Sequence, residues 1–96
     1  MATIKQVEKR VFDVEGFSVR IRHGRDSRDV RSDKAMVKQY GFRRALKHSK
    51  SVKDWRDGRF ARAYPGFVVD VLDSHGRIAH GRTLLSTVRD SYLEEE

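Results

Sequence analysis

The chain contains no cysteine among its 96 residues, so no disulfide bond can brace its fold and no thiolate can bind a metal or act as a nucleophile. Its stability must come from one apolar core, because a chain of this length buries only about 60–65% of its unfolded surface. Charged residues make up 36% of the chain, against about 25% in ordinary domains. We expect a single domain over residues 1–93, with a small core and a highly charged surface, followed by an acidic tail over residues 94–96.

The positive charge is concentrated in one third of the chain. Between residues 20 and 50, eleven Lys and Arg residues stand against three acids, whereas the other 65 residues carry ten basic and eleven acidic residues. The whole +7 excess therefore lies in this stretch. Because like charges repel one another, such a segment usually meets a negatively charged partner, most commonly a nucleic acid.

Two stretches alternate between apolar and polar residues, as β-hairpins do. Residues 7–23 have a turn at Glu15-Gly16, and residues 67–80 have one at positions 73–76. The core face of the first hairpin would carry Phe12, Val14, Phe17, Val19 and Ile21. The core face of the second would carry Phe67, Val69, Val71 and Ile78, with Asp70 pointing outward. We expect the two hairpins to form a mostly antiparallel four-stranded sheet.

Helical signals lie between the hairpins and after them. Apolar residues at i, i+3 and i+4 predict a short basic helix over residues 42–48. A capping box at residues 51–54 begins a second helix, which Tyr64-Pro65-Gly66 ends near residue 63. Thr83 can cap a third helix, whose inward residues would be Leu84, Leu85, Val88 and Tyr92. The predicted fold is therefore α+β, in the order β-β-α-(α)-β-β-α, with two or three short helices on one face of the sheet.

The basic stretch and the helix after it supply a predicted binding surface. Arginine suits bidentate contacts with phosphate, and an adjacent aromatic ring can stack on a base. The surface comprises Arg20, Arg22, Arg25, Arg28, Arg31, Arg43, Arg44, Lys47, Trp55, Arg59 and Arg62. Each part also has a structural explanation. Trp55 can be a core anchor, and the cations can form a solubilising surface. Residues 24–33 can form either a solvated loop with internal ion pairs or an arm that contacts phosphates.

Three other motifs in the sequence also have simpler explanations. His-Gly-Arg occurs three times, at residues 23–25, 75–77 and 80–82, where it can form either anion sites or ordinary turns. The spacing of Asp73, His75 and His80 matches no known ligand pattern, and we predict neither a metal nor a cofactor. Arg22-His23-Gly24 after a strand resembles the opening motif of the histidine phosphatase superfamily, in which the histidine accepts the phosphoryl group. The resemblance covers three residues and no second histidine lies in a matching motif, so we assign no such role to His23.

The sequence favours a small, basic, non-enzymatic module that associates with DNA or RNA through phosphate contacts of the 20–50 segment. The alternative is a regulator or inhibitor of the phage or plasmid type, antidefence-like, that binds an acidic protein or ribonucleoprotein surface. Such a protein could also form a homodimer through an exposed strand edge. No set of residues in the sequence matches a recognisable catalytic arrangement. The apolar runs are too short to span a membrane and the N-terminus lacks a signal-peptide core, so we expect a cytoplasmic protein.

Overall fold

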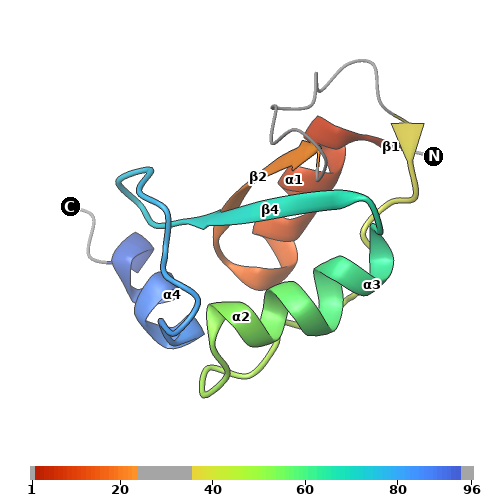
Figure 1. The fold of residues 1–96 in the computed structure, drawn as a ribbon. Helices are drawn as coiled ribbons and strands as arrows, with labels where there is room; N and C mark the ends of the chain where they lie inside the picture. Colours follow the sequence, from red (N-terminus) through yellow and green to blue (C-terminus); the bar gives the residue numbers. More distant parts are fainter. Residues whose placement is uncertain (1, 24–35, 94–96) are drawn as a thin grey trace.

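A two-stranded antiparallel sheet with helices on one face organises the molecule (Figure 1). The computed structural model describes residues 2–23 and 36–93. The elements are β1 (Ala2–Thr3), α1 (Ile4–Glu15), β2 (Ser18–His23), β3 (Met36–Val37), α2 (Val52–Trp55), the π-helical segment η1 (Arg56–Phe60), α3 (Ala61–Ala63), β4 (Phe67–Leu72) and α4 (Leu85–Leu93). Since α2, η1 and α3 follow one another without a break, we refer to residues 52–63 as the central helix.

The predicted first strand of the first hairpin is wrong, because residues 4–15 form α1. Its N-terminus carries a capping box: the Gln6 N–H donates to the Thr3 hydroxyl at 3.2 Å, and the Gln6 side chain accepts from the Thr3 N–H at 2.9 Å. Gly16 ends the helix in the left-handed conformation, with φ of 86°, and its N–H donates to the Phe12 carbonyl. Both ends of α1 are thus fixed by local signals.

The burial pattern explains why the helix prevails. Ile4, Val7 and Val11 are at most 1% exposed and follow helical spacing, whereas Phe12, which the hairpin placed in the core, is 43% exposed. The alternation at residues 12 and 14 is too short to outweigh a longer helical stripe that is capped at both ends.

The sheet consists of β2 and β4, in a register that pairs Val19 with Val71 and Ile21 with Val69. All four side chains are buried and face the helices, as predicted. On the other face, Arg22 forms an ion pair with Asp70, with Nε 3.0 Å from Oδ2. Phe17, just before β2, is fully buried, also as predicted.

The described residues form no four-stranded sheet. The return arm of the second hairpin is reduced to one bridge between Leu72 and Ile78, and Ile78 is 60% exposed. β1 and β3 pair separately as a second antiparallel sheet of two residues each. The reason is that α1 replaces one predicted strand and the residues after the 73–76 turn leave the sheet at once.

The central helix matches its prediction, with the Ser51–Asp54 capping box in place and Gly66 in the left-handed conformation beyond its end. The predicted helix over residues 42–48 is wrong, and that segment is irregular. Side chains from other elements use its backbone groups instead: the Leu46 N–H donates to Glu15 and the Leu46 carbonyl accepts from Arg89. In α4, Leu85 and Val88 are buried as expected, but Leu84 just before it is 46% exposed.

The result is a small compact α+β globule with a radius of gyration of 12.7 Å, close to the ~13 Å expected for 100 residues. Its core joins Phe17, Trp55 and Phe60 to the buried valines of α1 and the sheet. Within the described part of the chain, no helix combines the length and the apolar character of a membrane-spanning segment.

Candidate nucleic-acid interface

A buried ionic cluster fixes the segment between β3 and the central helix. Its centre is the Glu15 carboxylate at the end of α1, which is 0% exposed. One oxygen accepts from the Tyr40 hydroxyl at 2.5 Å and from Arg59 Nη1 at 2.6 Å. The other accepts from the Leu46 N–H at 3.0 Å and from Arg89 Nη2 at 3.2 Å. Four donors from three parts of the chain thus converge on one carboxylate.

The surrounding groups complete this cluster. Arg89, from α4, also donates to the main-chain carbonyls of Glu15 and Leu46. Burial lowers the pKa of its guanidinium, and the Glu15 charge opposes that shift. Burial, reinforced by the hydrogen bond to Glu15, raises the pKa of Tyr40, so its hydroxyl stays protonated and keeps donating. The cluster is therefore a structural clamp whose polar groups bond to one another.

Trp55 and Arg59 belong to this clamp rather than to a free binding stripe. Trp55 is 0% exposed and its indole N–H donates to the Tyr40 hydroxyl at 3.0 Å. The Arg59 side chain is 18% exposed and also donates to the Arg44 carbonyl at 2.6 Å. The core-anchor interpretation of Trp55 is the one that the structure supports.

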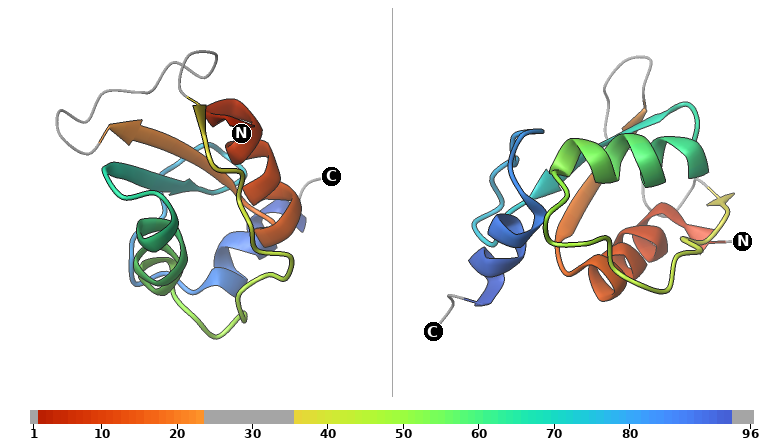
Figure 2. Two further views of the ribbon diagram at one scale, coloured as in Figure 1. Left: turned by 90° about the vertical axis from the view of Figure 1, so that its right-hand side faces the viewer. Right: turned by 90° about the horizontal axis from the view of Figure 1, so that it is seen from below.

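Four exposed cations surround the segment that the clamp holds, and we call them the basic surface: Arg10, Lys38, Arg43 and Arg62. The segment of residues 38–43 passes between α1 and α3 (Figure 2). Arg10 and Arg43 line one depression with Gln39, Tyr40 and Gly41. Lys38 and Arg62 line a second, which shares Gln39 and Gly41 with the first.

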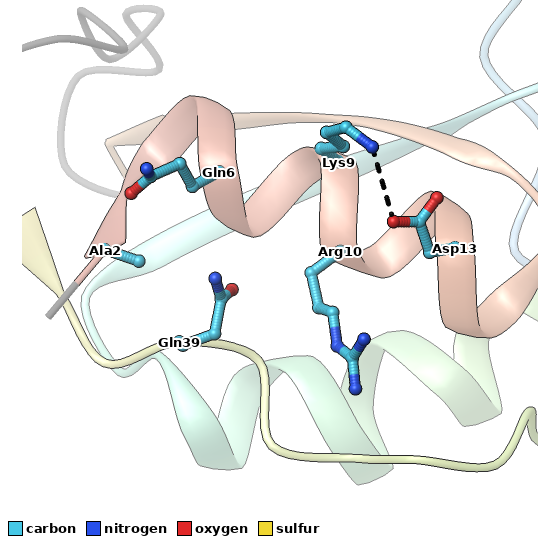
Figure 3. Close-up of a pocket in the computed structure, with 6 residues that line it drawn as sticks. All are labelled: Ala2, Gln6, Lys9, Arg10, Asp13 and Gln39. Carbon is cyan, nitrogen blue, oxygen red and sulfur yellow. Dashed lines mark ion pairs between the residues drawn. The ribbon is translucent and has the colours of Figure 1, made fainter.

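No acidic side chain among the described residues lines either depression, and none of the four cations forms an ion pair with a described residue. Arg10 and Gln39 also line a third depression, which contains Asp13; there the Lys9 ammonium lies 3.5 Å from the Asp13 carboxylate (Figure 3). Arg10 instead extends from α1 toward the segment after β3, from which Gln39 projects (Figure 3). Among the described residues, the unpaired positive charge that lines the two depressions is thus that of the basic surface.

An aromatic ring lies within the second depression. Phe42 is 36% exposed, and the Arg59 guanidinium packs 4.4 Å from its ring centroid. The Tyr40 ring lies 5.3 Å away at a tilt of 51°. The depression measures about 660 Å³ and is also lined by Gly58 and Ala63 of the central helix.

The structure divides the predicted site residues into separate groups. Arg43 and Arg62 lie on the basic surface, and Arg44 and Lys47 are exposed in the same irregular segment without lining its depressions. Arg20 and Arg22 lie on the sheet face opposite the helices, so they do not join the basic surface. The remaining three predicted residues lie outside the described part of the chain: Arg25, Arg28 and Arg31.

Three residues of the site were not predicted from the sequence: Arg10, Lys38 and Phe42. Arg10 was assigned to a strand, and the helical capping box at residues 3–6 was the signal that could have placed it on the exposed face of α1. Phe42 was expected to be buried in a helix that does not form. No local signal brings residues 10, 38, 43 and 62 together.

Among the described residues, no three His, Asp or Glu side chains gather closely enough to hold a metal ion. Comparison with known proteins gave no match to a protein-family model, to a curated protein or to a solved structure. The site must therefore be interpreted from its own geometry and charge.

Proposed function

We propose that this protein is a small non-enzymatic binding module that contacts the phosphates of a nucleic acid through the basic surface. The observation that carries the proposal is the convergence of Arg10, Lys38, Arg43 and Arg62 around one segment, with an exposed aromatic ring among them and no described acid lining the two depressions that the segment shares with Arg43 and Arg62. Arginine and lysine side chains release counterions when they neutralise phosphates, which supplies affinity without base specificity.

The clamp supports this proposal because it makes the surface rigid. Residues 38–48 contain little regular structure, yet Tyr40 and Leu46 are hydrogen-bonded to the buried Glu15 carboxylate. The cations at residues 38 and 43 therefore project from a fixed backbone, so less ordering entropy is lost on binding. An isolated stretch of the same composition would have to order itself first.

The test is a double charge reversal with a matched control. Arg43→Glu with Arg62→Glu changes the net charge by four units within the basic surface. Arg77→Glu with Arg82→Glu makes the same change on exposed residues of the loop after β4, at the other end of the molecule from α3 (Figure 1). Binding to labelled DNA and RNA oligonucleotides would be measured by fluorescence anisotropy across a range of salt concentrations.

We expect the wild type to bind with a log–log salt slope of about −3, since four phosphate contacts contribute about 0.7–0.9 each. The Arg43/Arg62 variant should lose more than tenfold in affinity and about half of the slope, whereas the Arg77/Arg82 variant should retain both within a factor of about two to three. Equal losses in the two variants would mean that net charge alone attracts nucleic acid, and the proposal would be wrong.

Binding to an acidic protein or ribonucleoprotein, with or without homodimer formation, remains the alternative proposal. It predicts a complex of defined stoichiometry that survives nuclease treatment, together with weak binding of all oligonucleotides at physiological salt. Size-exclusion chromatography with light scattering on nuclease-treated protein would distinguish a monomer from a homodimer.

A further inference from the structure

Building on the proposed function, we infer that the ligand of the basic surface is single-stranded nucleic acid, and that an unpaired base stacks on Phe42 in the depression beside Gly58. Exposed aromatic rings flanked by cations are the usual means of holding single strands, because every base offers a face for stacking. Duplex bases are paired and stacked on one another, so they cannot reach such a ring.

The Phe42 ring is held in place before any ligand arrives. The Arg59 guanidinium lies 4.4 Å from its centroid, and that guanidinium is itself bonded to Glu15 and to the Arg44 carbonyl, each at 2.6 Å. The ring nevertheless remains 36% exposed, whereas Tyr40 beside it is 2% exposed. A fixed and accessible ring can stack on a base with little loss of side-chain entropy.

Gly58 provides independent support from the facing helix. A glycine inside a helix costs about 1 kcal/mol relative to alanine, yet a Cβ at Gly58 would meet nothing within 4 Å. Packing therefore does not require a glycine here. The missing side chain leaves the wall of the depression open, and the same is true of Gly41 across it.

The backbone of the central helix is also unusual at this point. Gly58 and Arg59 lie within the π-helical segment η1, a rare conformation that is found frequently at functional sites. The depression of about 660 Å³ has ample room for one base, and Lys38 and Arg62 line it as partners for the flanking phosphates. The aromatic ring, the open wall and the cations thus all belong to the same depression.

The experiment compares a single-stranded DNA, a single-stranded RNA of the same sequence, and the DNA duplex, each about 12 nucleotides long and fluorescently labelled. Two variants test the site from its two sides: Phe42→Leu removes the ring, and Gly58→Gln fills the depression. Ala61→Gln is the matched control, because Ala61 is exposed on the same helix but lines no part of the depression. Circular dichroism and the fluorescence of the single tryptophan verify folding.

We expect the wild type to prefer single strands to the duplex by more than about tenfold at physiological salt. Phe42→Leu and Gly58→Gln should each lower single-strand affinity about tenfold, the usual size of one stacking contact, with an unchanged salt slope and unchanged duplex binding. Ala61→Gln should have no effect. A preference for the RNA or the DNA strand, with the same loss in Phe42→Leu, supports the inference and identifies the sugar.

Two results overturn the inference in distinguishable ways. Equal, salt-dependent binding of single strands and duplex, unaffected by Phe42→Leu and Gly58→Gln, refutes base stacking while the proposed function stands. Absence of salt-dependent binding to every oligonucleotide refutes both.

Discussion

Removing the Tyr40 hydroxyl isolates the energetic contribution of the clamp. That hydroxyl donates to the Glu15 carboxylate at 2.5 Å and accepts from the Trp55 indole N–H at 3.0 Å. Tyr40→Phe keeps the ring and its packing, but deletes the bond to the carboxylate and leaves the indole N–H buried without its acceptor. Glu15 retains its other three donors, so the rest of the clamp should stay assembled.

The expected destabilisation is about 3 kcal/mol. A hydrogen bond to a charged group contributes about 1.5–3 kcal/mol, and a buried donor without a partner costs about 1–3 kcal/mol. Because Glu15 keeps three other donors, the lower parts of these ranges apply, and they sum to about 3 kcal/mol. For a chain of this length, about 3 kcal/mol corresponds to a decrease in Tm of about 12–24 °C. With a urea m-value of about 2 kcal/mol/M, the unfolding midpoint should fall by about 1.5 M.

The assay is urea unfolding followed by the fluorescence of Trp55, the single tryptophan, with circular dichroism as a second probe. Tyr64→Phe is the matched control, because the Tyr64 hydroxyl is also buried but bonds to no described residue. Its removal should leave the midpoint unchanged or raise it slightly. Equal midpoints for the two variants, or a loss below about 0.5 kcal/mol in Tyr40→Phe, would refute the assignment of the clamp as a main source of stability.

Two further predictions concern the same buried groups. Glu15→Ala leaves the guanidinium groups of Arg59 and Arg89 without their carboxylate, and should lower the free energy of unfolding by about 3–5 kcal/mol; a loss below about 1 kcal/mol in thermal melts would contradict this. Burial raises the pKa of Tyr64 to about 12, so the stability that its neutral form provides is complete below pH ~10 and is lost as the pH rises toward 12. Urea unfolding between pH 9 and 12 should show the free energy of unfolding decreasing by up to about 1.4 kcal/mol per pH unit for each buried tyrosine. Tyr64→Phe should make this decrease with pH shallower, and an unchanged decrease in that variant would disprove the prediction.

Local signals predicted several elements correctly. The Ser51–Asp54 capping box begins the central helix, and Tyr64-Pro65-Gly66 ends it. The inward face of β2 was also correct. These features depend on residues within a few positions of one another, so the sequence displays them directly. The N-terminal helix carried equally local signals, at Thr3, Gln6 and Gly16, and the hairpin interpretation overlooked them.

The sequence by itself thus determined the central helix, the β2 strand, the single small core and the excess of positive charge. Only the tertiary structure decided that residues 42–48 are not helical, because Glu15 and Arg89, 31 and 43 positions from Leu46, bond to its backbone. It also decided which cations assemble: Arg10, Lys38, Arg43 and Arg62 come from α1, an irregular segment and the end of the central helix. Charge counted along the chain cannot show this, because a binding surface is defined by proximity in space.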